Sequence, residues 1–491
     1  MADAGPGRVV APTLTDPVAR SLSEVVGGPV GAHGRPHRWW TPVRVLLAIF
    51  TVVFAIGLVQ KAPCITTDWN SDSVRYSRMC YSDIPYLYTG RGLAERQWPY
   101  SDGSGTGHGR YPAMEYPVGI AYFAWAAAEL TGLVATGPPE AQRAATQPAN
   151  IWGMPGMATE INRYFLITAV LLFGAGLVAV RFLAGAHRHR PWDAAAFALS
   201  PALLLAGLVN WDLLAVACTA GALWAWSRGR PVWAGIFVGL GTATKLYPLF
   251  LLGAFLVVAL RRRRPSWAAS AGLAAVLAWL VAQVPAWATG GLDRWTAFWT
   301  FNADRGPDLG SLWLAASDWT GHAASAHTIN VVSWLVFGSC CVAVLVLGLR
   351  VRHPPRVAQL AFLVTVAFLA VNKVYSPQYV LWLLPLAVLA RPRWRDQLVW
   401  QAAEVFYFAM VWIYLGGWLQ SSSGSGSPAY DAAIVVRVVG ELWLAALVVR
   451  DMVRPEHDPA RDDGSGSVEC LDNDPMTPLD AGVRAAPAVS R

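Results

Sequence analysis

Long apolar stretches constrain the fold of this chain more than any other feature of its sequence. They recur between residues 43 and 450. Each is about 20 residues long, the length of helix that crosses a hydrocarbon core about 30 Å thick. Of the 491 residues, 55% are hydrophobic and only 14% are charged. In soluble domains about a quarter of the residues are charged. The sequence therefore predicts an all-α, polytopic membrane protein and excludes a string of water-soluble domains.

We predict about twelve transmembrane helices within one membrane domain, residues 43–450. The expected spans are residues 43–60, 162–183, 193–209, 211–227, 231–244, 246–260, 266–288, 328–350, 357–372, 378–391, 397–418 and 432–450. The flanking segments, residues 1–42 and 451–491, are rich in Pro, Gly, Asp and Ser, so we expect both to be disordered. Residues 1–42 show no signal-peptide pattern, so the first span is expected to target the chain.

Clusters of Lys and Arg in the short loops set the expected orientation. They lie at residues 187–190, 228–230, 261–264, 350–356 and 391–395. The positive-inside rule places these clusters in the cytoplasm together with both termini. They also account for the net charge of +7 without a nucleic-acid-binding surface. Two long loops, residues 61–161 and 289–327, are then external, and we expect the function to reside there.

The apolar stretch 116–134 is the one segment that does not fit this alternation. Counting it as a span would move the basic cluster at 187–190 to the outside. We therefore expect a re-entrant or interfacial helix within the first external loop. Glu129, inside the stretch, also argues against full exposure to lipid.

Two of the six cysteines, Cys64 and Cys80, flank a polar part of this first external loop. The other four lie in predicted spans or in the tail, without metal-ligand spacing. If the loop faces an oxidising compartment, Cys64 and Cys80 could form a disulfide. The alternative is two free thiols, and the sequence does not decide between them.

Polar residues gather at the outer ends of the spans and in the external loops. They occupy residues 80–86, 110–117, 210–212, 245–248, 302–306 and 372–379. Lys245 and Lys373 are informative because short outer loops are usually poor in cations. Each lysine either snorkels to the headgroups or binds an anionic ligand. Arg305 either pairs with a neighbouring aspartate or contacts a phosphate, which the adjacent Gly306 would allow to approach the backbone.

Acidic residues on the same side are candidates for a general base. Asp83 lies in a tyrosine-rich part of the first loop, whereas Asp68 lies nearer the first span in plainly polar surroundings. Glu115 and Asp212 belong to two of the other outer motifs. The external histidines have no carboxylate or cysteine partners at ligand spacing, so we predict no metal site. These histidines are His108, His322 and His327.

In their order along the chain, these motifs resemble those of GT-C superfamily membrane glycosyltransferases. The similarity is greatest to actinobacterial polyprenol-phosphate-mannose-dependent alpha-1,2-mannosyltransferases and covers most of residues 43–450. It rests on Ser-Asp-Ile-Pro-Tyr at 82–86, Glu-Tyr-Pro at 115–117, Asn-Trp-Asp at 210–212, Thr-Lys-Leu-Tyr-Pro at 244–248 and Asn-Lys-Val-Tyr-Ser-Pro-Gln-Tyr at 372–379. Tyr-Pro-Val stands here where the family usually has Tyr-Pro-Pro, after a Gly/Ser-rich insertion at 101–109.

The resemblance implies transfer of a hexose, with mannose favoured, from a polyprenol-phosphate sugar to a hydroxyl of a lipid or glycan acceptor. The reaction would invert the anomeric centre at the outer face of the plasma membrane. An aspartate of the first external loop is the family's general base, and Asp83 resembles it most, with Asp68 as the alternative. Cations would stabilise the polyprenyl phosphate leaving group, so neither a cofactor nor a metal is expected.

The other site residues follow from the same resemblance. The expected donor-phosphate ligands are Lys245, Arg305 and Lys373. The expected donor or sugar contacts are Tyr86, Tyr247, Asn372 and Gln378. Glu115 and Asp212 are expected as acceptor-binding or secondary acidic residues.

Two functions from other classes remain as alternatives. Twelve spans with both termini inside also suit a transporter or a flippase of lipid or polyprenol-linked sugar. The sequence shows neither an internal repeat nor paired broken helices at mid-membrane depth, and its polar motifs lie at the outer ends of the spans. A non-catalytic scaffold would leave those motifs without a role.

Overall fold

The computed structural model describes residues 16–18, 21, 39–101, 110–187, 190–419 and 426–460. Within these ranges all regular structure is helical. The predicted all-α, polytopic membrane protein is therefore confirmed. Most of the segments expected to be disordered, together with His108, Arg188 and Cys470, lie outside the described residues.

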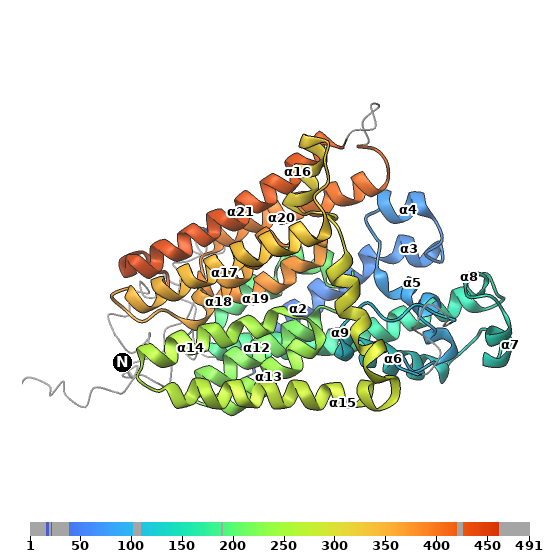
Figure 1. Ribbon diagram of the computed structural model, residues 1–491, viewed down its shortest axis with the longest axis horizontal. Coiled ribbons are helices and arrows are strands. Elements are labelled where there is room, and N and C mark those ends of the chain that lie inside the picture. Colours follow the sequence, from blue (N-terminus) through green and yellow to red (C-terminus); the bar gives the residue numbers. More distant parts are fainter. Residues whose placement is uncertain are drawn as a thin grey trace, which may run out of the picture.

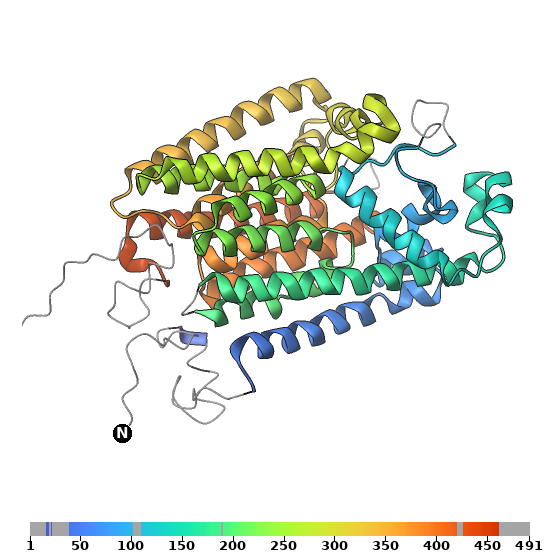
Figure 2. The same cartoon turned by 90° about the horizontal axis from the view of Figure 1, so that it is seen from below.

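The long helices form a bundle (Figures 1 and 2). In chain order they are α2 (Pro42–Gln60), α9 (Met157–Ala186), α12 (Leu213–Ser227), α13 (Pro231–Thr244), α14 (Leu251–Arg261), α15 (Pro265–Asp304), α17 (Ala326–Arg350), α18 (Val357–Val371), α19 (Val380–Ala390), α20 (Trp394–Leu415) and α21 (Pro428–Val453). Several begin with proline in the first turn, where its missing N–H costs no helical hydrogen bond. Basic loops precede two of these prolines, Pro231 and Pro265. A basic loop also precedes Pro191, which begins the short helix η2.

Six helical segments within the described ranges are long and apolar enough to cross a membrane: residues 42–66, 157–186, 265–304, 326–350, 394–415 and 428–453. Five of the other expected spans are shorter apolar helices. Helix α19, for example, has 11 residues and is about 17 Å long at 1.5 Å per residue. These findings support a multi-pass membrane protein, and the total of twelve spans remains a prediction.

The expected span at 193–209 is not one helix, which corrects the prediction. The chain there forms η2 (Pro191–Ala194), α10 (Ala195–Ala198) and α11 (Pro201–Ala206). The break follows from Pro201, which disfavours helical geometry at Ser200 and cannot donate to a preceding turn. Ser200 instead caps α11, since its hydroxyl accepts a hydrogen bond from the Leu203 amide.

Helix α15 begins at Pro265 and is broken at Gly291, where φ is 62° and ψ is −170°, so its first segment agrees with the expected span at 266–288. A glycine adopts this backbone without the steric penalty that a Cβ would bring. Residues 292–304 therefore form a separate helical segment, seen between the α15 and α16 labels in Figure 1. This segment belongs to the predicted second external loop, which also contains α16 (Leu312–Thr320).

The predicted first external loop is folded rather than extended. It contains α3 (Ala62–Thr66), α4 (Asp72–Ser77), α5 (Asp83–Gly90), η1 (Leu93–Glu95), α6 (Val118–Gly132), α7 (Glu140–Ala145) and α8 (Pro148–Ile151). A disulfide joins Cys64 to Cys80, which settles the question that the sequence left open. The stretch 116–134 is helical as predicted. This helix, α6, packs against α9, α13 and α15.

The loop helices lie together at one end of the bundle. In Figures 1 and 2, α7 and α8 lie at the end opposite to the one where α21 finishes. The connections from α14 to α15 and from α17 to α18 lie at the end where α21 finishes (Figure 1). These two connections carry the arginines at 261–264 and 350–356. The basic clusters and the loop helices are thus on opposite sides, as the predicted topology requires.

The tail was expected to be disordered from residue 451, and the structure moves this boundary. Helix α21 continues to Val453, and η5 (Pro455–His457) follows it. Asp458 is buried and pairs with Arg356 at 2.7 Å. Acidic residues just beyond the last span therefore fold back onto the basic loops, because opposite charges that are buried together compensate each other.

Arg391 connects three helices at this basic end. The side chains of Arg391, Asp396 and Asp451 are wholly buried, and the arginine pairs with Asp396 at 2.6 Å and also with Asp451. Arg391→Ala should lower the free energy of unfolding by about 3–5 kcal/mol, because two buried carboxylates lose their counter-charge. Thermal unfolding in detergent measures the change. Arg395→Ala is the matched control: Arg395 also pairs with Asp396 but is 54% exposed, so its loss should cost about 1 kcal/mol or less. Equal effects of the two substitutions would contradict this account.

Candidate active site

A cavity of about 710 Å³ opens where the loop helices meet the bundle. Its walls come from both predicted external loops and from α17, α18, α19 and α20. Seven of the ten predicted site residues line it: Asp83, Glu115, Lys245, Arg305, Asn372, Lys373 and Gln378. Segments that are almost 300 residues apart in sequence therefore line one cavity.

Asp83 occupies the first position of α5 and is fixed there by the chain around Val209. Its backbone amide donates to the Val209 carbonyl at 2.8 Å, and the Ser82 hydroxyl donates to the same oxygen at 3.3 Å. The Ser82 hydroxyl also caps α5 by accepting from the Ile84 amide. The base candidate is thus docked directly onto the membrane bundle.

Two neutral donors hold the Asp83 carboxylate. The Asn210 side-chain amide donates to Oδ2 at 2.7 Å, and the Tyr81 hydroxyl donates to Oδ1 at 2.9 Å. Burial raises the pKa of the Asp83 carboxyl above its usual value, while the bonds from Asn210 and Tyr81 and the charge of Lys245 lower it. The net direction is upward, so this carboxylate accepts a proton more readily than an exposed aspartate does.

Lys245 enters the cavity from the end of α13, where its extended backbone stops the helix. Its Nζ lies 3.5 Å from Oδ1 of Asp212 and 5.0 Å from the centroid of the Tyr116 ring. Asp212 is wholly buried, lies outside the cavity lining and accepts a 2.6 Å hydrogen bond from the Trp382 indole. In this structure Asp212 therefore orients Lys245 from behind the wall.

Lys373 and Arg305 are the other two cations in the lining. The Lys373 ammonium donates to Oδ1 of Asn330 at 2.7 Å and to the Ala303 carbonyl at 3.1 Å. Arg305 pairs with Asp308, with Nε 2.6 Å from its carboxylate, and still lines the cavity. Burial and the nearby Arg305 lower the pKa of Lys373. Both cations have hydrogen bonds to protein groups as well as access to the cavity.

Apolar side chains also line the cavity. They come from α17, α18 and α20: Ile329, Phe337, Phe368, Val371, Val411 and Leu415. The rings of Phe337 and Phe368 meet edge to face at 5.5 Å. The cavity therefore combines a cationic region with a hydrocarbon-like wall.

Three predicted site residues do not line this cavity. Besides Asp212, these are Tyr86 and Tyr247. Tyr86 donates to the Trp69 carbonyl and stacks behind Tyr81, with ring centroids 5.3 Å apart. Tyr247 is wholly buried against Trp382. Both tyrosines therefore lie behind the residues that could touch a sugar.

Asp68, the alternative base, also lies outside the lining. It is exposed on the polar loop and accepts a hydrogen bond from the Asn162 side-chain amide at 3.2 Å. Its backbone has a positive φ of 52°. Its surroundings are those of a solvated turn residue.

Several lining or bridging residues were not assigned roles from the sequence. Asn210 bridges the Asp83 carboxylate and the Tyr116 hydroxyl, the latter at 2.9 Å. Asn330 and Ser333 both line the cavity from α17, three residues apart, and Asn330 binds Lys373. Asn210 was within a recognised motif, whereas Asn330 could have been found as a polar residue that shares a helix face with Ser333.

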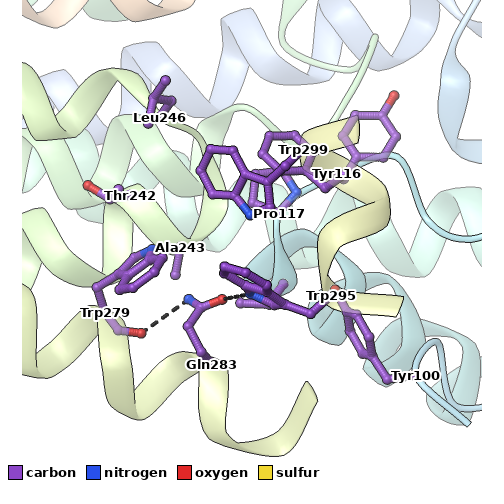
Figure 3. Close-up of a pocket in the computed structure, with 12 residues that line it drawn as sticks. Tyr100, Tyr116, Pro117, Thr242, Ala243, Leu246, Trp279, Gln283, Trp295 and Trp299 are labelled. Atoms are coloured by element: carbon purple, nitrogen blue, oxygen red, sulfur yellow. Dashed lines mark hydrogen bonds between the residues drawn. The ribbon is translucent and has the colours of Figure 1, made fainter. Parts of the chain in front are cut away.

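A narrower aromatic recess adjoins the cavity (Figure 3). The two share Tyr116, Pro117, Leu246, Phe298 and Trp299 in their linings. The Gln283 amide lies between Trp279 and Trp295, donating to the Trp279 carbonyl and accepting from the Trp295 indole at 2.8 Å. The recess measures about 20 Å³, enough for one or two waters, which each require roughly 10–15 Å³. In this state it cannot hold a sugar ring.

Comparison with known proteins identifies the class of enzyme. Residues 151–372, a little under half of the chain, match the model of glycosyltransferase family 87. The protein is a membrane glycosyltransferase. This confirms the class of enzyme that the outer motifs predicted. The matched region of this glycosyltransferase contains Asn210, Lys245 and Arg305, and Asp83 and Lys373 lie outside it.

No curated protein matches the glycosyltransferase. Among solved structures it is similar to ArnT from Cupriavidus metallidurans bound to undecaprenyl phosphate, with 14% sequence identity and a TM-score of 0.40. The similarity covers 84% of this chain and 77% of that chain. Within the described ranges, no group of three or more His, Cys, Asp or Glu residues is placed to hold a metal ion. The expected independence from metals remains a prediction.

Asn210→Ala should shift the acid limb of the glycosyltransferase's pH–rate profile to higher pH. The Asn210 amide stabilises the charged form of Asp83, so its loss raises the pKa of the carboxyl further and leaves less base at a given pH. At neutral pH, kcat/KM should fall about tenfold, the effect of losing a hydrogen bond to a charged group. Asn302→Ala is the control, because Asn302 lines the same cavity but its amide binds the Phe298 carbonyl. An unchanged or acid-shifted limb in Asn210→Ala would disprove the assignment.

Proposed function

We propose that this glycosyltransferase moves a hexose from a polyprenol-phosphate sugar to a hydroxyl of a lipid or glycan acceptor. Mannose is the sugar favoured by the sequence resemblance. The observation that carries the proposal is the shared cavity, whose lining includes a hydrogen-bonded carboxylate, cations and an apolar wall. The reaction takes place at the external face of the plasma membrane, with both termini in the cytoplasm.

The donor phosphate binds near Lys373 and Arg305. A phosphate in a region shielded from water needs fixed positive charge and hydrogen-bond donors, which a lysine and an arginine supply together. The prenyl chain lies against the apolar wall of α17 and α18, beginning at Val371 and Phe368. Asn372 and Gln378 remain our candidates for donor or sugar contacts. Gln378 is buried, and its Oε1 has no hydrogen-bond partner among the residues that the structure describes.

Asp83 acts as the general base. The acceptor oxygen attacks the anomeric carbon as the bond from that carbon to the phosphate oxygen breaks. The hydroxyl proton passes to the Asp83 carboxylate, and the bonding electrons leave with the polyprenyl phosphate. A single displacement of this kind inverts the anomeric centre. Glu115 lines the cavity and pairs with Arg91, a placement compatible with an acceptor-side role.

Lys245 assists at the same end of the cavity. Its charge favours the ionised form of Asp83, and its ammonium stays close enough to the cavity to meet the donor's sugar or phosphate. Because lysines and an arginine can balance the phosphate charge, no divalent metal is required. Transfer should therefore persist in EDTA.

Asp83→Asn should reduce kcat by at least about 100-fold, the usual contribution of a general base. Purified protein in lipid vesicles is incubated with radiolabelled polyprenol-phosphate sugars, one sugar at a time, together with membrane acceptors. Asp68→Asn serves as the matched control and should stay within about threefold of the unmodified enzyme, because Asp68 is exposed outside the cavity. Retained transfer by Asp83→Asn, or loss of transfer only in Asp68→Asn, would move the base assignment to Asp68. No incorporation from any donor would favour a transporter or flippase.

Lys373→Gln should raise the donor KM about 10- to 100-fold, because a hydrogen bond between charged groups is lost. The unmodified enzyme's donor affinity should weaken at alkaline pH, as Lys373 loses its charge. Since its pKa lies below the usual lysine value, this weakening begins earlier than for an exposed lysine. Initial rates at varied donor concentration and pH provide both measurements. A donor KM that is indifferent to the substitution would place the phosphate elsewhere.

A further inference from the structure

The two segments that carry Arg305 and Lys373 are joined along their backbones. The Asp308 amide donates to the Lys373 carbonyl at 2.9 Å, and the Tyr375 amide donates to the Leu309 carbonyl at 2.8 Å. Neither segment belongs to a helix. The relative position of the two cations therefore depends on whatever fixes this pair of strand-like connections.

Gly310 is inserted between two tyrosines at the end of this pairing. Its φ is +72°, and a Cβ there would collide with the Tyr407 hydroxyl and the Tyr375 carbonyl. Those two groups also bind each other, since the Tyr407 hydroxyl donates to the Tyr375 carbonyl at 2.8 Å. The Gly310 segment thus packs against Tyr407 of α20 without space for a Cβ, so only glycine fits at this position.

Arg437 of α21 binds both segments at this point. Its Nη2 donates to the Gly310 carbonyl at 2.9 Å, and its guanidinium lies 3.5 Å from the centroid of the Tyr375 ring. Glu441 accepts from Nη1 at 2.7 Å. The side chain is 1% exposed, deep within a candidate span. A charged residue in this setting is costly and rare unless it has a specific partner or task.

Arg437 contacts residues outside its own helix as well as within it. Its ion pair with Glu441 lies within α21, and its guanidinium also lies 5.4 Å from the centroid of the Tyr407 ring of α20. Its contacts with Gly310 and Tyr375 reach the two cation-bearing segments. Glu404 of α20 reinforces the second of these by accepting from the Tyr375 hydroxyl at 2.9 Å. The buried network therefore contacts the Gly310 carbonyl, in the segment that carries Arg305, and the side chain of Tyr375, two residues after Lys373.

We propose that Arg437 is a positioning residue for donor binding: it holds the Arg305 and Lys373 segments together so that both cations meet one phosphate. Arg437 itself lines no part of the cavity. The inference rests on the proposed function, because it takes the donor phosphate to bind at these cations. A two-point contact with phosphate is sensitive to spacing, and displacements near 1 Å can cost a large part of the binding energy.

Arg437→Gln tests the proposal in the full-length enzyme. The donor KM should rise about tenfold, as for the loss of a charged hydrogen bond, while the acceptor KM and kcat change less than about threefold. Inhibition by a short-chain polyprenyl phosphate, which lacks the sugar, should weaken by the same factor as donor binding. Arg437→Lys keeps the charge but not the two-sided geometry, so it should fall between Arg437→Gln and the unmodified enzyme. Arg450→Gln, at the opposite end of α21 and partly exposed, is the control and should leave the donor KM unchanged.

Gly310→Ala disturbs the same contact from the side of the Arg305 segment, and it replaces Arg437→Gln as the test variant if that protein does not fold. It should also raise the donor KM selectively. A normal donor KM and normal inhibition by polyprenyl phosphate in a folded Arg437→Gln or Gly310→Ala variant would overturn the inference. An equal rise in donor and acceptor KM would also overturn it, because such a rise indicates general damage. If the unmodified enzyme transfers no sugar from any polyprenol-phosphate donor, it is the proposed function that has failed instead.

Discussion

The cavity depends on the contact between the first external loop and the chain at residues 209–210. Val209 accepts two hydrogen bonds from the start of α5, and the Asn210 amide reaches the carboxylate of Asp83. Without this contact, the loop would carry a carboxylate with no fixed relation to the cations of the bundle. The proposed general-base chemistry requires a base within hydrogen-bond reach of the attacking hydroxyl, so under that proposal the docking of the loop on the bundle is a condition for the reaction.

Charge is handled differently at the two ends of the bundle. At the basic end, Arg391 is buried with two carboxylates and its side chain is used entirely for structure. At the cavity end, Lys245, Arg305 and Lys373 also have protein partners, but these partners leave each cation facing the open volume. Burial with compensation stabilises the first end, whereas incomplete enclosure leaves the second able to bind an anion.

The sequence predicted the architecture well wherever local signals decide it. Apolar length identified the segments of the bundle. It failed at 193–209, where apolar composition outweighed the effect of Pro201. It ended the span at 266–288 close to the break at Gly291, but it did not predict the helical segment that follows within the second external loop. Asp83, Lys245 and Lys373, which the motifs singled out, line one cavity in the structure. They could not show that Tyr247 and Asp212 lie behind its wall, because burial depends on neighbours that are distant in sequence. Arg437 escaped notice for the same reason, since its partners lie at Gly310 and Tyr375.

The cavity draws its lining from residues between Tyr76 and Leu415. The disulfide between Cys64 and Cys80 can form early in synthesis, but α20 must be inserted before the walls are complete. A growing chain therefore lacks the complete cavity until most of the protein has been made. The same arrangement means that no fragment ending before α20 retains the whole lining. The cavity is a property of the finished bundle, completed near the end of the protein's biosynthesis.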